Sequence, residues 1–377
     1  MRIILIGLLI RCIVSIYNGL NGPIPGAEAD AILFHEIVVS ILNGEGHFRS
    51  DTFGLSTFLQ IHAFIAKIFV PSIIVGGLFS AFIWLLSALI ILQITKDLKF
   101  SDEDRFFCLI IYCFFPSSIL ITSVMLREVF QLLFVNLAFF FLIKSFISSK
   151  LKSVLLFVLS IITLVIAAQF HKGLVIFAPL SVILSIIYLA ILGVDKLKIP
   201  NKKILITSML IFISFCLVIT IKFKLESINF QYDEFISKMI ERLVSQNNNH
   251  NIGRATYMHH KEMDNILDII FFIPEMFINY FIQPIPSYID TFGDYIAFFE
   301  NILRIAFIAF CIFFSFNKDV PNRKIFILLF LNFLLLELVW SIGTVNYGTA
   351  IRHHIPGLGL ILICFFNLRI GKFYEKK

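Results

Sequence analysis

The sequence predicts an all-α, polytopic transmembrane protein, and three observations support that class. Hydrophobic residues make up 59% of the 377 residues and charged residues only 15%, too little polar coverage for the surface of a soluble domain. The mean hydropathy is +0.92, and 45 residues are Phe. The apolar runs are continuous over about 17 to 23 residues, as a membrane-spanning helix requires, whereas an outer-membrane barrel has alternating segments of about ten.

The topology follows from five clusters of Lys and Arg, at residues 96–105, 144–152, 196–203, 318–324 and 369–377. The positive-inside rule assigns such segments to the cytoplasm. Residues 1–377 are therefore predicted to form a single integral membrane domain with both termini in the cytoplasm. Joining the clusters predicts about ten spans, at residues 3–20, 73–95, 106–123, 128–146, 154–170, 174–193, 204–221, 296–315, 325–342 and 355–371.

The first span is expected to be retained, because Arg11 interrupts it and no small-x-small cleavage site follows. Residues 21–55 then form an acidic outer loop, in which residues 27–41 have the pattern of an amphipathic helix lying flat on the membrane. Glu28, Asp30 and Glu36 lie within nine residues of a chain that otherwise avoids charge. Such carboxylates suit a general base at the bilayer surface, the alternative being a solvated polar face.

Two further apolar segments are residues 58–70 and 266–282. If either of them spanned the membrane, a basic cluster would lie on the wrong side of it. We expect both to be interfacial or re-entrant helices, the second interrupted by Pro274. It belongs to a large periplasmic loop over residues 222–295. There Arg254, followed by Tyr257 and the apolar segment, is predicted to fold back over a membrane-facing pocket and contact substrate.

Three further outer turns carry charge. Arg127 and Glu128 open one span, and both are predicted to contact the diphosphate-bearing substrate. A cation is unfavourable at a helix N-terminus, which favours phosphate binding by Arg127; for Glu128 the alternative is a helix cap or an intrachain ion pair. His171 and Lys172 interrupt a long apolar stretch, either as a polar hairpin or as contacts to a diphosphate. Arg352 and His353 precede Pro356, which is predicted to start the last helix, so that Arg352 would lie at its positive end. Arg352 and His353 are therefore both predicted to contact a phosphate or an acidic sugar.

Within the spans, Glu337 and Trp340 are predicted to face the bundle interior or its outer mouth. Glu300 and Arg304, four residues apart, suggest a structural ion pair. The acidic segment 102–104 lies in a short basic loop, where a solvated turn is favoured over a metal site. No Walker loop and no zinc-protease helix is present. No cofactor is predicted, and the patterns leave a divalent metal ion open.

Arginines and an acidic cluster on one face suit the transfer of a sugar from a polyprenyl-diphosphate carrier, with arginine binding diphosphate and a carboxylate deprotonating the acceptor hydroxyl. The acid-bearing loop at 28–35 after a first span resembles multispan glycosyltransferases of the GT-C type. The segments 115–118, 126–128 and 348–354, the Phe content and the large outer loop resemble Wzy-type O-antigen repeat-unit polymerases.

The resemblance implies a GT-C-like fold in a bacterial inner membrane and polymerisation of undecaprenyl-diphosphate-linked oligosaccharide repeat units, for O-antigen or capsule, at the periplasmic face. Asp30, with Glu28 as its partner, would occupy the position of the catalytic acid in the first outer loop of GT-C enzymes. Arg127, Arg254 and Arg352 would bind diphosphate or sugar. Its implied partners are the lipid-linked oligosaccharide, membrane lipid, a chain-length regulator and a flippase, with no nucleic acid. This chain departs from those polymerases in having one long outer loop rather than two.

Two other enzyme or transport functions remain open from the sequence. A GT-C glycosyltransferase would add a single sugar from a polyprenyl-phosphate donor. A flippase for lipid-linked oligosaccharide would also need a cationic cavity, with charges along the bundle and pseudo-symmetric halves. A non-catalytic assembly subunit is a third alternative, and it would tolerate substitution of Asp30 and Arg352.

Overall fold

The computed structural model describes residues 1–24, 28–44, 55–191, 255–257 and 266–368. Within these ranges all regular elements are helices, and one antiparallel bridge joins Thr256 to Asn346. Six described helices are long and apolar enough to cross a membrane, or eight if each of two bent pairs is one span. The all-α membrane class is therefore confirmed, the number of ten spans is not, and the predicted span at 204–221 lies outside the described residues.

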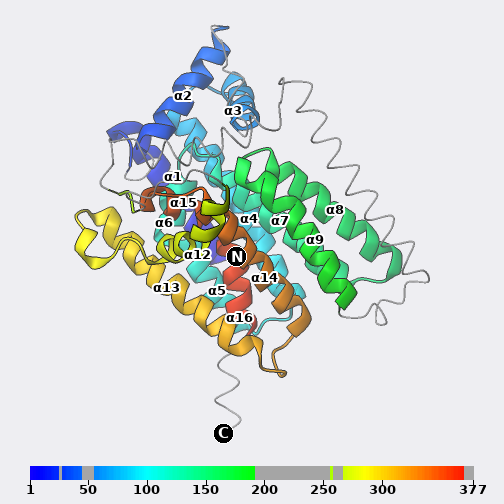
Figure 1. Cartoon of the computed structure of the whole chain (residues 1–377). Coiled ribbons are helices and arrows are strands. Elements are labelled where there is room, and N and C mark those ends of the chain that lie inside the picture. The colour runs from blue at the N-terminus through cyan, green and yellow to red at the C-terminus, as the bar shows by residue number, and fades with distance from the viewer. Residues whose placement is uncertain (25–27, 45–54, 192–254, 258–265, 369–377) are drawn as a thin grey trace.

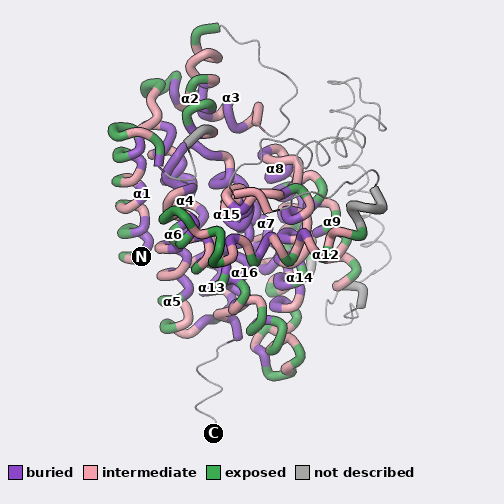
Figure 2. The backbone as a smooth tube through the Cα atoms, turned by 60° about the vertical axis from the view of Figure 1, so that its left-hand side comes forward, coloured by how far each residue is buried: buried purple, intermediate pink, exposed green. Residues whose placement is uncertain are grey.

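The six long helices are α1 (Arg2–Asn21), α4 (Ile73–Asp97), α7 (Glu128–Ile147), α8 (Lys150–Ala168), α13 (Phe292–Ser315) and α14 (Arg323–Ile342). In Figure 1, α8 lies beside α7, and α9 (Lys172–Ile191) packs against α8 and α14, while α4 packs between α1 and α7. Figure 2 shows exposed positions along α1 and α13. They include large apolar side chains such as Leu5, Leu9, Phe299 and Phe313, which suit contact with lipid.

A close approach of α1 and α4 depends on Gly77. A Cβ atom added there would lie 2.2 Å from the Ser15 hydroxyl and 2.7 Å from the backbone oxygen of Ser123. We expect Gly77→Ala to lower the free energy of unfolding by about 1–3 kcal/mol, because the backbone at Ser123 would have to shift to make room for the new Cβ atom. Denaturant unfolding in micelles measures this. Gly343→Ala is the control, since a Cβ there meets open space, and equal effects of the two substitutions would contradict the account.

The predicted span 106–123 is broken. Helices α5 (Asp102–Phe114) and α6 (Pro116–Thr122) meet at a bend of 53°. Pro116 causes the break, because proline has no N–H and its ring clashes with the preceding turn. Two charged side chains bind the backbone groups at the break: Arg11 donates to the Cys113 oxygen at 2.9 Å, and Glu300 accepts from the Ser117 N–H at 2.6 Å.

Arg11 is fully buried and joins α1 to both sides of this bend. Its Nε donates to the Thr122 hydroxyl at 2.7 Å and its Nη2 to that of Ser118 at 3.1 Å. The guanidinium also lies 3.5 Å from the centre of the Trp84 ring. A residue that interrupts the first apolar run is therefore part of the packing that holds the broken helix in place.

The predicted last span, 355–371, also differs. The chain forms a short helix, α15 (Tyr347–His353), then a turn, then α16 (Leu358–Asn367), with a bend of 63°. Asn346 starts α15 by accepting hydrogen bonds from the N–H groups of Gly348 and Thr349. Arg352 consequently lies in the last turn of α15 rather than at the positive end of the final helix. That part of the prediction is wrong, and a cation is favourable at a helix C-terminus.

The segments predicted not to span form helices α2 (Glu28–Leu42), α3 (Ser56–Ile68) and α12 (Ile266–Ile282). Helices α2 and α3 stand together at one end of the bundle (Figures 1 and 2). At 13 residues, α3 is too short to cross a bilayer. Pro274 lies inside α12 without ending it, so the predicted interruption there is wrong.

Candidate functional site

Arg352 brings two carboxylates together from distant parts of the chain. It lies on α15, and its Nη1 donates to Asp30 of α2. Its Nε and Nη2 both donate to one oxygen of Glu128, at 3.1 and 2.8 Å. The side chain of Glu128 is 1% exposed and that of Asp30 is 39% exposed. One arginine therefore links a buried acid at the start of α7 to an acid that solvent can reach.

Arg127 adds a second cation to this group. It immediately precedes α7, where its charge opposes the helix dipole, and its Nε is buried with no hydrogen-bond partner among the described residues. Burial lowers the pKa of Arg127, and the neighbouring Glu128 and Asp30 counteract this effect. Asp30, Arg127, Glu128 and Arg352, called here the acid–arginine cluster, thus contain two carboxylates and two guanidinium groups.

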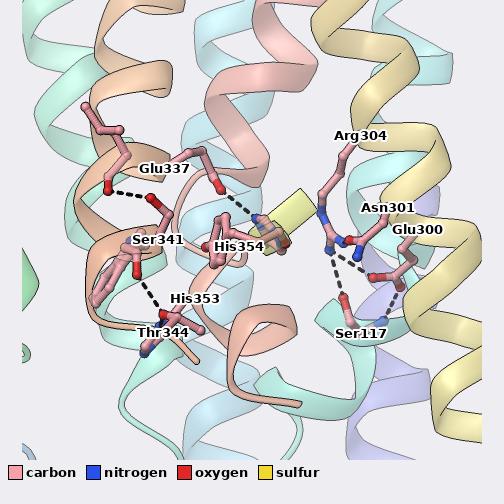
Figure 3. Close-up of polar contacts among 12 residues, drawn as sticks. Ser117, Glu300, Asn301, Arg304, Glu337, Ser341, Thr344, His353 and His354 are labelled. Carbon is pink, nitrogen blue, oxygen red and sulfur yellow. Dashed lines mark hydrogen bonds and ion pairs between the residues drawn. The ribbon is translucent and has the colours of Figure 1, made fainter. Parts of the chain in front are cut away.

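His171 and His353 form a second group with Trp340. The His353 ring stacks on Trp340 with 4.4 Å between ring centres, and the His171 ring lies 4.4 Å from Trp340 and 5.2 Å from His353. His353 also contacts the Thr344 hydroxyl at 2.7 Å (Figure 3). Gly173 permits this packing, because a Cβ there would lie 2.7 Å from the Trp340 ring. Lys172, the first residue of α9, is half-buried beside His171.

His171 is predicted to make the protein sensitive to acid. Burial, followed by the nearby charges of Arg127, His353, Arg352 and Lys172, holds the pKa of His171 well below its usual value. The unfolded chain, with a His pKa of about 6.5, then binds the proton more readily than the folded protein. This contribution to stability is complete above about pH 6.5 and is lost progressively as the pH falls below it.

The measurement is the unfolding midpoint as a function of pH for the wild type and for His171→Asn. Asparagine retains an acceptor for the Gly173 N–H, which His171 Nδ1 accepts at 3.0 Å, but it does not titrate. We expect the variant to have a shallower acid slope between about pH 6.5 and pH 5. Identical slopes would contradict this role of His171.

Glu337 and His354 form a third group, drawn in Figure 3. Nδ1 of His354 lies 2.5 Å from a carboxylate oxygen of Glu337, and both side chains are 1% exposed. The Tyr280 ring lies 4.1 Å from that of His354. Glu337 therefore faces the bundle interior, one of the two positions predicted for it.

The predicted pair of Glu300 and Arg304 is confirmed as a contact. The two side chains meet at 2.9 Å, with 3% and 4% exposed. Arg304 also donates to Asn301 at 2.8 Å, and Glu300 binds the N–H at the start of α6. The pair therefore supports the α5–α6 break, and its role is structural in this arrangement.

Several predicted site residues are not brought to the acid–arginine cluster. Glu36 is exposed on α2, and six positions along a helix correspond to a rotation of about 240°, so it occupies another face than Asp30. The side chain of Glu28 and the whole of Arg254 lie outside the described residues. The acids at 102–104 occupy the first turn of α5, where Asp102 pairs with Arg105 at 2.8 Å at the surface.

The segment just after Arg254 nevertheless lies next to α15. The Tyr347 N–H donates to the Ala255 oxygen and the Tyr257 N–H to the Val345 oxygen, both at 3.0 Å. The Tyr257 hydroxyl donates to the Thr344 oxygen at 2.8 Å. Residues 255–257, which follow Arg254 directly, are thereby joined to the start of the helix that carries Arg352 and His353.

Comparison with protein-family models, with curated proteins and with solved structures gives no match for this chain.

Proposed function

We propose that this chain is a membrane glycosyltransferase that polymerises undecaprenyl-diphosphate-linked oligosaccharide repeat units at the periplasmic face of a bacterial inner membrane. The observation that carries the proposal is the joint contact of Arg352 with Asp30 and Glu128, beside Arg127. Planar guanidinium groups suit the oxygens of a diphosphate, and a partly exposed carboxylate suits proton removal from a hydroxyl.

In the proposed reaction, Asp30 takes the proton of the acceptor hydroxyl as its oxygen attacks the anomeric carbon of the donor. The bond between that carbon and the diphosphate oxygen breaks, and undecaprenyl diphosphate leaves with the bonding electrons. Arg127 and Arg352 stabilise the charge on the leaving group. Glu128, which is buried, holds Arg352 in position through one carboxylate oxygen.

The arrangement of ion pairs also suggests an order of events. Before substrate binds, Asp30 is paired with Arg352. A diphosphate next to Arg127 would compete for Arg352 and release the Asp30 carboxylate to act as a base. Coupling of this kind would keep the base inactive until the anionic donor has bound.

A flippase for the same lipid-linked substrate is the second candidate, and one observation favours it. Two spans are broken, at α5–α6 and α15–α16, and charged side chains such as Arg11, Arg304 and Glu337 are buried within the spans. Discontinuous helices often form substrate sites in transporters. Against it, Arg304 has a carboxylate partner and Arg11 is bonded to neighbouring hydroxyl and carbonyl groups.

Surface polysaccharide from a deletion strain of the source bacterium, analysed by gel, distinguishes these functions. For a polymerase, we expect lipid A core bearing one repeat unit in the deletion strain and a restored ladder after complementation with the wild-type chain. Loss of even the single repeat unit would instead indicate a flippase or an earlier glycosyltransferase. A normal ladder in the deletion strain would contradict the proposal.

A further inference from the structure

Four side chains, three at the start of α7 and one on α14, have buried polar atoms without a hydrogen-bond partner in the described part of the chain. They are Nε of Arg127, Oε2 of Glu128, both polar atoms of Gln131, and Nε1 of Trp340. Glu128 and Gln131 are 0% exposed and Trp340 is 2% exposed. Buried polar groups are nearly always paired, so a group of unpaired ones calls for a specific explanation.

These side chains belong to one place in the fold. Arg127 and Gln131 are four residues apart at the start of α7, and Glu128 and Gln131 are three apart, so all three share one side of its first turns. Glu128 binds Arg352, and the next residue, His353, stacks on Trp340. Gln131 therefore extends the acid–arginine cluster by one helical turn toward the bundle interior.

The chemistry of the unpaired atoms indicates what they bind. Arg127, Gln131 and Trp340 each offer an N–H donor, while Glu128 and Gln131 each offer an acceptor oxygen. A fully ionised phosphate accepts hydrogen bonds and donates none, so it cannot satisfy the two acceptors. A hydroxyl group both donates and accepts, and neighbouring hydroxyls on a sugar ring satisfy a mixed set of this kind.

We propose that Gln131, together with Oε2 of Glu128 and Nε1 of Trp340, binds hydroxyl groups of a saccharide next to the acid–arginine cluster. The inference rests on the proposed function, in which the saccharide is joined to the diphosphate that the arginines bind. It adds a specificity residue, Gln131, and assigns a role to the free oxygen of Glu128.

The test is the unfolding midpoint of the full-length protein in lipid nanodiscs, because sugar-based detergents would compete for the site. The probes are glucose, galactose, mannose, rhamnose, N-acetylglucosamine and N-acetylgalactosamine, and, separately, undecaprenyl diphosphate. We expect at least one of the sugars to raise the wild-type midpoint. Gln131→Met should lower the affinity for that sugar at least tenfold, so that a tenfold higher sugar concentration is needed for the same midpoint shift. The midpoint shift caused by undecaprenyl diphosphate should be unchanged.

Asn136→Leu is the matched control, since it also removes a buried amide from α7. Asn136 donates to the Ser87 hydroxyl at 2.8 Å and to the Tyr112 hydroxyl at 3.0 Å, so its loss should lower the midpoint and leave the sugar response unchanged. Gln131→Met should keep or raise the midpoint without ligand, because no protein hydrogen bond is lost.

Three results would overturn the inference: no midpoint shift with any of these sugars, an unchanged sugar response in Gln131→Met, or a loss of stability in Gln131→Met as large as in Asn136→Leu. Failure of the proposed function gives a different result, in which undecaprenyl diphosphate has no effect on the wild-type protein. The two failures are therefore distinguishable.

Discussion

Replacing Asp30 with Asn is expected to slow glycosyl transfer by about 10²- to 10⁴-fold, the usual contribution of a general base. Asparagine has nearly the same size and still accepts a hydrogen bond from Arg352, but it cannot take the proton of the acceptor hydroxyl. The measurement is the rate of undecaprenyl diphosphate release by the purified variant in proteoliposomes, with substrate extracted from the deletion strain.

Glu36→Gln is the control for this experiment, since it removes an exposed carboxylate from the same helix on another face. We expect its rate to equal that of the wild type. If Asp30→Asn retained more than about a tenth of the wild-type rate, proton transfer to Asp30 would not be part of the mechanism.

Arg352→Met is expected to lower the free energy of unfolding by about 3–5 kcal/mol. The substitution leaves Glu128, which is 0% exposed, without the cation that two hydrogen bonds now connect to it. Breaking a buried ion pair from one side is costly, because the remaining charge is desolvated and unpaired. Unfolding of the purified variant by denaturant in mixed micelles measures the change.

Two controls accompany this prediction. The double substitution Arg352→Met with Glu128→Leu should recover most of the lost stability, since it removes both charges. Arg105→Met should cost less than about 1 kcal/mol, because its partner Asp102 has a side chain that is 97% exposed. A single Arg352→Met variant as stable as Arg105→Met would contradict the buried pairing.

The membrane class and many helix bounds could be predicted, because continuous apolar runs of span length have few structural alternatives. Residues 266–282 form α12 over the predicted range. The breaks at α5–α6 and α15–α16 were harder. Pro116 and Pro356 mark them in the sequence. The side chains that bind the backbone at the first break, Arg11 and Glu300, lie far away along the chain, so the sequence does not reveal these contacts.

The candidate site was partly predictable for a similar reason. Charge is rare in this chain, so Asp30, Arg127, Glu128 and Arg352 were each conspicuous. Their pairing was not predictable, because the contacts of Arg352 span 322 and 224 residues of sequence. Gln131 was missed altogether, since one amide in an apolar run gives no signal until its lack of a partner is visible.

The most direct test of the central claim uses the wild-type protein in proteoliposomes, supplied with undecaprenyl-diphosphate-linked repeat units from the deletion strain. Mass spectrometry of the lipid fraction follows the products. Our account predicts lipid-linked oligosaccharides of two or more repeat units, with one undecaprenyl diphosphate released for each new linkage. Repeat units that stay single, with no undecaprenyl diphosphate released, would contradict it.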